Sequence, residues 1–347
     1  MGSVQSAYYY AKDLNESLNN IRIVTGKNTK EMAAFAKEAN EAAKALSTTT
    51  TQYTDASLIY YQQGLPDEEV KARTDTTIKM ANVTRESAQE VSQQLTAIWN
   101  NFAKGADNLE FYTDVITALG ATPASSSSEI AEGIEKFTSF ADIVGLSYEY
   151  ATTALASVTA TTRQSADVVG NAFKTLFARI QGLKLGETLD DGTYLNKYSD
   201  ALDAVDINIK NTNGELKDMD SILDELSSRW KTLGKHQQLA LAQTIAGVSQ
   251  YTQLIPLMDN WDFFEQNLQV AQQSEGTLEE QANVYAESWE AATKRVKAVA
   301  ENIYQNLLDD KFFINLSDTF ANKLLKCFRR SSRITCRSRF FNFKIIW

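Results

Sequence analysis

The side chains able to do acid–base, thiol or metal chemistry are few and isolated. His236 is the only histidine, and its context TLGKHQQLALAQ contains no GxSxG or comparable nucleophile. A histidine dyad or triad needs such a partner, so we interpret His236 as a polar residue at a helix start. The two cysteines, Cys327 and Cys336, form no CxxC pair and have no histidine nearby. Their spacing therefore does not match a zinc site.

One loop imitates a calcium site. Asn211, Asn213 and Gly214 would occupy positions 3, 5 and 6 of an EF-hand loop. Position 1 would then be Ile209, which has no oxygen ligand, and position 12 would be Asp220 in place of glutamate. Calcium needs a full oxygen shell, so a hairpin turn at Asn213–Gly214 explains this loop better.

Nucleotide-binding signatures are missing as well. The sequence contains neither GxxxxGK[ST] nor GxGxxG. Acidic residues are many, but a solvated face is the usual role of carboxylates on helices. We therefore predict no catalytic, cofactor-binding or metal-ligating residue, no cofactor, no small-molecule substrate and no enzyme.

The composition favours long helices. Three prolines and 15 glycines occur in 347 residues, and few helix breakers among many helix formers indicate helical structure. This length suits two or three domains. No apolar run approaches the roughly 18 residues that span a bilayer, and no export signal begins the chain; we expect no membrane span.

Charge is unevenly distributed. From Lys323 onward there are eight Lys or Arg and no acid, so all 44 acidic residues lie before that point. An acidic body repels phosphate backbones, which argues against direct sequence-specific nucleic-acid binding. Both cysteines also lie in this tail, and a body without cysteines suits a reducing compartment.

Apolar residues recur at helical spacing, three and four residues apart. The stripes are Met32, Phe35, Ala39, Ala42 and Leu46; Val91, Leu95, Ile98 and Phe102; Ile130, Ile134, Phe137, Ala141 and Val144; Val169, Phe173, Leu176 and Ile180; and Leu223, Leu226, Trp230 and Leu233. Three starts carry a capping-box pattern: Asn28 with Glu31, Ser87 with Glu90, and Ser126 with Glu129.

The most regular pattern lies in residues 278–307. Its apolar positions are Leu278, Ala282, Tyr285, Trp289, Ala292, Val296, Val299, Ile303 and Leu307. The 4-3 alternation predicts one long amphipathic helix, either in a globular bundle or in a coiled coil. We expect this stripe to be buried, first within the chain around Trp230 and Trp261, with self-association through any part left exposed.

The same helix-start pattern occurs twice in the sequence. TRESAQEVSQQLTAIW, from Thr84, matches TTRQSADVVGNAFKTLFARI, from Thr161. Arg85 corresponds to Arg163 and Ser87 to Ser165, an offset of 78 residues. The second copy has Val168 where the first has Glu90, so its capping box is expected to be incomplete. The pattern predicts two similar helix-turn-helix units.

The fold class expected is mainly α: antiparallel helical hairpins or a bundle, a long C-terminal amphipathic helix, and one small β-hairpin at about residues 205–218. Val205, Ile207 and Ile209 alternate with polar residues before Asn213–Gly214, as in a hairpin. Four segments are expected: a helical core with the duplicated unit (1–185), a loop with the hairpin (186–222), a helical region (223–320) and the basic tail (321–347).

Three stretches resemble a known family. They are STTTTQYTDASLIYYQQGLPDEEVKARTDTTIKMANVTRESAQEVSQQLTAIWNNF, GLSYEYATTALASVTATTRQSADVVGNAFKTLFARIQGLKLGETLDDG, and LAQTIAGVSQYTQLIPLMDNWDFFEQNL. Together with YAESWEAATKRVKAVAENIYQNLLDDKFFINLSD, they are similar to the core region of phage tail tape measure proteins over residues 5–320. The basic tail does not share this resemblance, and we interpret it as a truncated or frame-shifted end, or else as a basic arm.

The resemblance implies a structural role without catalytic residues. Family members are mostly helical chains in the tail lumen whose length sets tail length. They associate with tail tube and tail initiator proteins and with tail assembly chaperones, and they leave the tube at genome delivery. This implies location in the virion, and in the host cytoplasm during assembly. Two alternatives stay open: a cytosolic helical adaptor acting through the 278–307 stripe, and a muralytic tail protein.

Overall fold

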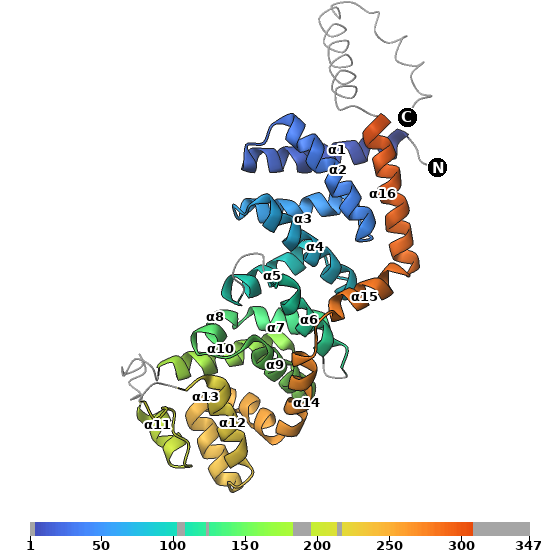
Figure 1. Cartoon of the computed structure of the whole chain (residues 1–347). Helices are drawn as coiled ribbons and strands as arrows, with labels where there is room; N and C mark the ends of the chain where they lie inside the picture. The colour runs from blue at the N-terminus through green and yellow to red at the C-terminus, as the bar shows by residue number, and fades with distance from the viewer. Residues whose placement is uncertain (1–3, 103–107, 123–124, 183–195, 214–216, 308–347) are drawn as a thin grey trace, which may run out of the picture. The chain divides into compact units, whose positions relative to one another are not determined.

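The computed structural model describes residues 4–102, 108–122, 125–182, 196–213 and 217–307. The chain divides into two compact units, one made of residues 1–70 and 286–347 and the other of residues 71–285. The secondary-structure elements assigned in the described residues are all helices, which confirms the mainly α fold class. Figure 1 labels the helices.

Unit 1 is the pairing of the N-terminal helices with the last one. Its helices are α1 (Val4–Thr25), α2 (Thr29–Ala45), α3 (Thr50–Gln62) and α16 (Trp289–Leu307), with the first residues of α4 (Asp67–Thr84). α3 packs against α1 and α2, and α16 packs against α2 and α1. The capping box of Asn28 and Glu31 starts α2, as predicted.

Unit 2 holds the rest of α4 and the helices that follow it. They are α5 (Ala88–Phe102), α6 (Leu109–Gly120), α7 (Ser127–Glu135), α8 (Thr138–Ile143), α9 (Tyr148–Thr162), α10 (Ala166–Gly182), α11 (Asn196–Asp203), α12 (Met219–Trp230), α13 (Lys235–Asp259), α14 (Trp261–Gln272) and α15 (Thr277–Ala286, up to Tyr285). The core is built around α9, which packs against α6, α7, α10, α13 and α14.

α9 is buried along almost its whole length, from Tyr148 to Thr159. Its small residues, in the run ALASVTA, let neighbouring helices approach from several sides. A helix that is enclosed all round needs no single apolar stripe. For this reason the 3-4 spacing that marks the other helices did not single out α9.

The duplicated helix starts form the same turn twice. α4 and α9 end in Thr84 and Thr162, and the next residues, Arg85 and Arg163, adopt left-handed φ values of 63° and 58°. Each threonine hydroxyl donates to the carbonyl four residues earlier and accepts the backbone N–H two residues later. The two copies of the repeat therefore share the same turn and the same threonine hydrogen bonds.

The serines of the repeat precede their helices in both copies. Ser87 and Glu90 exchange hydrogen bonds, Glu90 N–H donating to Ser87 Oγ at 3.2 Å and Ser87 N–H donating to Glu90 at 3.1 Å. In the second copy Val168 is half exposed and offers no such bond. There the hydrogen bond from Ser165 lowers the pKa of Asp167.

The second copy makes a close crossing that the first does not. A Cβ added to Gly170 in α10 would lie 2.3 Å from the carbonyl oxygen of Gly133 in α7. A Cβ added to Gly133 would in turn lie 2.8 Å from the carbonyl oxygen of Ala166. The equivalent position in the first copy is Ser92, whose hydroxyl bonds to Gln89 O within its own helix.

The kink in α13 occurs at Gly247. Its φ of 84° and ψ of 171° are outside the helical region and are accessible essentially only to glycine. Before the kink Leu241 and Ile245 are buried, and after it Leu254 and Leu257. At 100° per residue these pairs lie on different faces of a straight helix, so the kink lets both halves bury their apolar residues.

The predicted β-hairpin at residues 205–218 is wrong. In the described part of that stretch no strand forms; there is an isolated bridge at Lys210 and one backbone bond from Lys217 N–H to Ile209 C=O. The alternation is misleading because its first residues close α11. Asp206, at a φ of 60°, and the bond from Ile207 N–H to Leu202 C=O end that helix in a left-handed cap.

The single long helix expected over residues 278–307 is also wrong. It is divided into α15 and α16, with Glu287 and Ser288 between them. Ser288 starts the second helix, because its side-chain oxygen accepts the N–H of Ala291 at 3.1 Å and its carbonyl that of Ala292 at 3.0 Å. An N-cap serine of this kind ends one helical register and begins another.

Candidate functional site

The residues first considered for chemistry are not brought together. His236 is the second residue of α13 and is exposed, and the part of the chain that the structure describes has no cluster of three metal-ligating side chains. Cys327, Cys336 and Gly214 lie outside the described residues. Ile209, the would-be first calcium ligand, is buried.

Instead, three carboxylates each cap the start of a helix distant in sequence. They are Asp114 in α6, Asp220 in α12 and Glu301 in α16, and we call them the carboxylate clamps. Asp114 accepts two backbone N–H groups, and Asp220 and Glu301 accept one each. These N–H groups lie at helix starts, where the helix itself offers no acceptor. The positive end of the helix macrodipole favours a carboxylate at that place.

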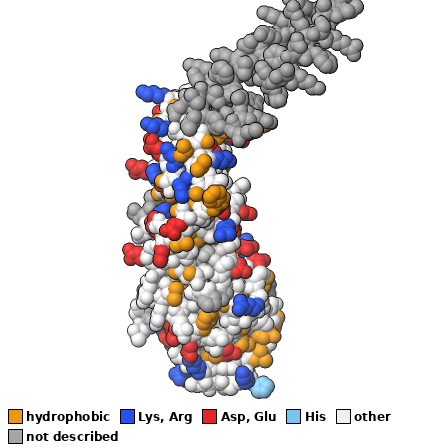
Figure 2. Space-filling model, turned by 90° about the vertical axis from the view of Figure 1, so that its right-hand side faces the viewer, with side chains coloured by type: hydrophobic (Ala, Val, Ile, Leu, Met, Phe, Trp, Pro, Cys, Tyr) orange, Lys and Arg blue, Asp and Glu red, His pale blue; other side chains and the backbone are white. Residues whose placement is uncertain are grey.

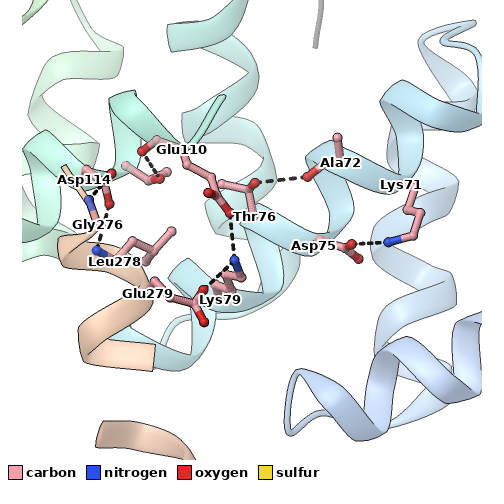
Figure 3. Close-up of polar contacts among 11 residues, drawn as sticks. Lys71, Ala72, Asp75, Thr76, Lys79, Glu110, Asp114, Gly276, Leu278 and Glu279 are labelled. Atoms are coloured by element: carbon pink, nitrogen blue, oxygen red, sulfur yellow. Dashed lines mark hydrogen bonds and ion pairs between the residues drawn. The ribbon is translucent and has the colours of Figure 1, made fainter. Parts of the chain in front are cut away.

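Asp114 holds the start of α15 in unit 2. Its two oxygens accept the N–H groups of Gly276 at 2.9 Å and Leu278 at 2.8 Å (Figure 3). Gly276 has a φ of 80°, which turns the chain so that both N–H groups point to the same carboxylate. Burial raises the pKa of Asp114 despite these bonds.

Lys79 reinforces the same junction between α4, α6 and α15. Its Nζ lies 2.7 Å from Glu110 and 2.7 Å from Glu279 (Figure 3). Burial acts to lower the pKa of Lys79, but the hydrogen bonds to the two glutamates outweigh it, and the pKa is raised. One charge thus joins three helices, beside the clamp of Asp114.

Asp220 links α12 to α9. The backbone N–H of Ser147, the N-cap residue of α9, lies 3.2 Å from one carboxylate oxygen and 3.4 Å from the other. Burial raises the pKa of Asp220. Tyr150, one turn further along α9, donates to Asp224 at 2.8 Å, which is a second hydrogen bond between α9 and α12.

Glu301 joins the last helix of unit 1 to the start of α3. Its carboxylate accepts the N–H of Thr50 at 2.8 Å. Beside it Asn40 donates to Thr50 Oγ1 at 2.8 Å and to Ala298 O at 3.0 Å, and Asn302 donates to Asn40 at 2.8 Å. These bonds fix α16 on the corner between α2 and α3.

We expect Glu301→Gln to change the pH dependence of unfolding. Burial raises the pKa of Glu301 above its ordinary value of 4.5. The stability gained from this group is therefore fully present below pH 4.5 and is lost as pH rises through the raised pKa. The melting temperature of Glu301→Gln minus that of the wild type should therefore be higher at pH 7 than at pH 5. Thermal melts of both proteins at both pH values measure this difference.

Glu287→Gln, at an exposed glutamate just before α16, is the control. It removes the same charge from solvent, so its difference from the wild type should not change between the two pH values. A pH-independent difference for Glu301→Gln as well would show that its carboxylate is solvated.

α16 buries alanines and polar residues on its inner side and exposes large apolar residues on its outer side. Ala291 and Ala298 are fully buried, whereas Trp289 is 87% exposed, Val296 70% and Val299 48%. The expected packing of the 278–307 stripe around Trp230 and Trp261 is therefore wrong for α16, which packs against α2 and α1. Leu278, at the beginning of the stripe, is buried in unit 2. Alanines allow close helix approach, and the polar bonds described above decide which face of α16 is inside.

The sequence analysis did not predict the clamps, because it assigned the carboxylates to solvated faces of helices. One signal could have found Asp114: it stands inside the apolar run FYTDVITALG. A charge surrounded by core residues must find donors, since an unpaired buried charge is costly. Glu301 and Asp220 follow ordinary amphipathic patterns and carry no such signal.

The geometry defines a class of protein: a helical scaffold in which buried polar side chains of one helix secure the start of another. The family of phage-related minor tail proteins matches residues 36–247, more than half of the chain. The chain belongs to this family. It therefore has a structural role in a phage tail, is associated with the virion and contacts other tail components. No solved structure matches the chain.

None of the described helices is both long enough and apolar enough to cross a bilayer.

Proposed function

We propose that the chain is a segment of a tail tape measure protein that sets tail length during assembly and takes part in genome delivery. Its place is then the tail lumen, and the host cytoplasm before assembly. Tail tube proteins, tail initiator proteins and assembly chaperones are the proposed partners. The resemblance of residues 5–320 to that family's core supports this proposal.

The repeated turn is the structural observation that best supports this proposal. A protein that measures length can gain or lose repeats only if the local geometry is kept at each joint. Thr84–Arg85 and Thr162–Arg163 have the same backbone conformation and the same hydrogen bonds. Residues 85–162 could therefore be duplicated or removed in phase, because the joined ends rebuild the same turn.

The test is a phage whose gene carries residues 85–162 twice. If those 78 residues add to the ruler as helix, at 1.5 Å per residue, tails should lengthen by up to about 120 Å in electron micrographs. A phage with residues 85–162 deleted should have tails shortened by a similar amount. Normal tail length in infectious particles of either phage would rule out length determination by this segment.

We propose no enzymatic activity, with site, cofactor and metal residues all absent, and no direct sequence-specific nucleic-acid binding. The muralytic alternative is tested by zymography: clearing of peptidoglycan by the purified chain would overturn this proposal. The helical adaptor is favoured by one observation, the exposed apolar residues of α16. An adaptor would leave tail length unchanged in the duplication experiment.

The four-segment division at residues 185, 222 and 320 also remains a proposal. Limited proteolysis of the purified chain should cut first within residues 186–222 and 321–347 if these are the linking segments. Cuts confined to other stretches would favour a different division.

A further inference from the structure

The outward side of α16 has an unusual distribution of side chains. We define its outer face as Trp289, Thr293, Val296 and Val299, which are all exposed. Polar residues of the same helix, including Glu301 and Asn302, are turned inward instead. Figure 2 shows hydrophobic side chains interspersed with charged ones on the side of the molecule where α16 lies.

An exposed tryptophan on the same face as exposed valines costs solvation free energy unless a partner covers it. At about 25 cal/mol per Å² of apolar area, the gain from covering such a surface is substantial. α16 is held in place through its inner face, by Arg295 to Ser47 at 2.8 Å and by Asn302 to Asn40 at 2.8 Å. The outer face is therefore presented on a fixed helix.

The charges beside this face are complementary to those of a second copy of the same helix. Glu290 and Lys297 are both exposed and lie seven residues apart, on the same flank of the helix and about 10 Å from each other along its axis. Glu290 also pairs with Lys294 at 3.2 Å. In two antiparallel copies of α16, related by a two-fold axis near Thr293, Glu290 of each helix lies next to Lys297 of the other.

The apolar residues fit in the same arrangement. With that two-fold axis, Trp289 of one helix lies level with the stretch between Val296 and Ala300 of the other, so a large side chain faces small ones. A parallel, in-register pair would instead place Trp289 against its own copy and separate the opposite charges by two turns. The face is thus complementary to itself only in the antiparallel sense.

We propose that two copies of this chain associate through the outer faces of α16, antiparallel and around a two-fold axis near Thr293. This inference does not depend on the tape measure proposal. Because one pair of helices buries less than the roughly 800 Å² per partner of a standard interface, the dimer is expected to be weak.

The test is sedimentation velocity on the full chain over a range of concentrations. The wild type should pass from monomer to dimer with a dissociation constant on the order of 10 micromolar or weaker. Val296→Glu should remain monomeric at every concentration while keeping the thermal melting temperature of the wild type. Val248→Glu, at a valine that is 79% exposed in unit 2, is the matched control and should still dimerise.

Charge reversal distinguishes the orientation. Glu290→Lys and Lys297→Glu should each weaken the dimer at least several-fold, and the double variant should restore it, because the ion pairs re-form with opposite sign. A wild type that stays monomeric, a dimer unaffected by Val296→Glu, an oligomer of more than two copies, or a double variant that fails to restore association would each overturn the proposal.

Discussion

Asp114→Ala is expected to destabilise unit 2 by about 2–4 kcal/mol, because it leaves the N–H groups of Gly276 and Leu278 without their acceptor; each such loss costs about 1–3 kcal/mol. In a protein of this size, each kcal/mol corresponds to a fall in melting temperature of about 2–4 °C. Thermal unfolding followed by circular dichroism measures it. Hydrogen exchange should also show faster exchange at the start of α15 than elsewhere.

Two variants separate the clamp from general effects of charge. Asp114→Asn keeps one acceptor oxygen and removes a buried charge, so its loss should be smaller. Glu110→Ala removes a partly exposed ion pair of Lys79 on the same helix and should cost about 1 kcal/mol or less. If Asp114→Ala and Glu110→Ala were equally mild, water would be replacing the carboxylate and the clamp would carry no stability.

Gly170→Ala is expected to lower the stability of unit 2 by about 1–3 kcal/mol through overpacking. The new Cβ would lie 2.3 Å from the carbonyl oxygen of Gly133, and 3.1 Å from its carbonyl carbon. These are backbone atoms of a neighbouring helix, so α7 and α10 must move apart. Equilibrium unfolding in urea gives the change in free energy.

The sign of this result is informative. Alanine is a better helix former than glycine by about 1 kcal/mol, so without the close crossing Gly170→Ala would stabilise α10. Gly234→Ala, at the start of α13, is the control: its new Cβ would have its nearest neighbour at 3.5 Å. A rise in stability for Gly170→Ala would show that α7 and α10 do not approach as closely as the structure has them.

Local features of the helices followed directly from the sequence. The capping boxes at Asn28, Ser87 and Ser126 all form, because cap and acceptor are only three residues apart and need no tertiary partner. The two copies of the helix start adopt the same turn for the same reason. The stripes of α5 and α10 are buried at Val91, Leu95, Val169 and Phe173, since each is the helix's one apolar face.

Where two local signals conflict, the sequence pattern was misleading. The alternation at residues 205–209 is compatible with a strand, but a left-handed cap after α11 uses the same residues. The 4-3 rhythm of residues 278–307 crosses Ser288, which starts a new helix. The buried face of α2 is also turned relative to the predicted stripe. Met32 and Ala39 are buried as predicted, but Ala36 and Ala43 are buried with them and Phe35 is only half-buried.

The sequence alone determined that the chain is mainly helical, where several helices begin, and that no familiar catalytic motif is present. These features depend on propensity and on neighbours a few residues away. The tertiary structure decided which polar residues became essential. Asp114 meets Leu278 across 164 residues and Thr50 meets Glu301 across 251. A carboxylate is solvated or a clamp depending on whether distant N–H groups reach it, and only the folded chain brings them together.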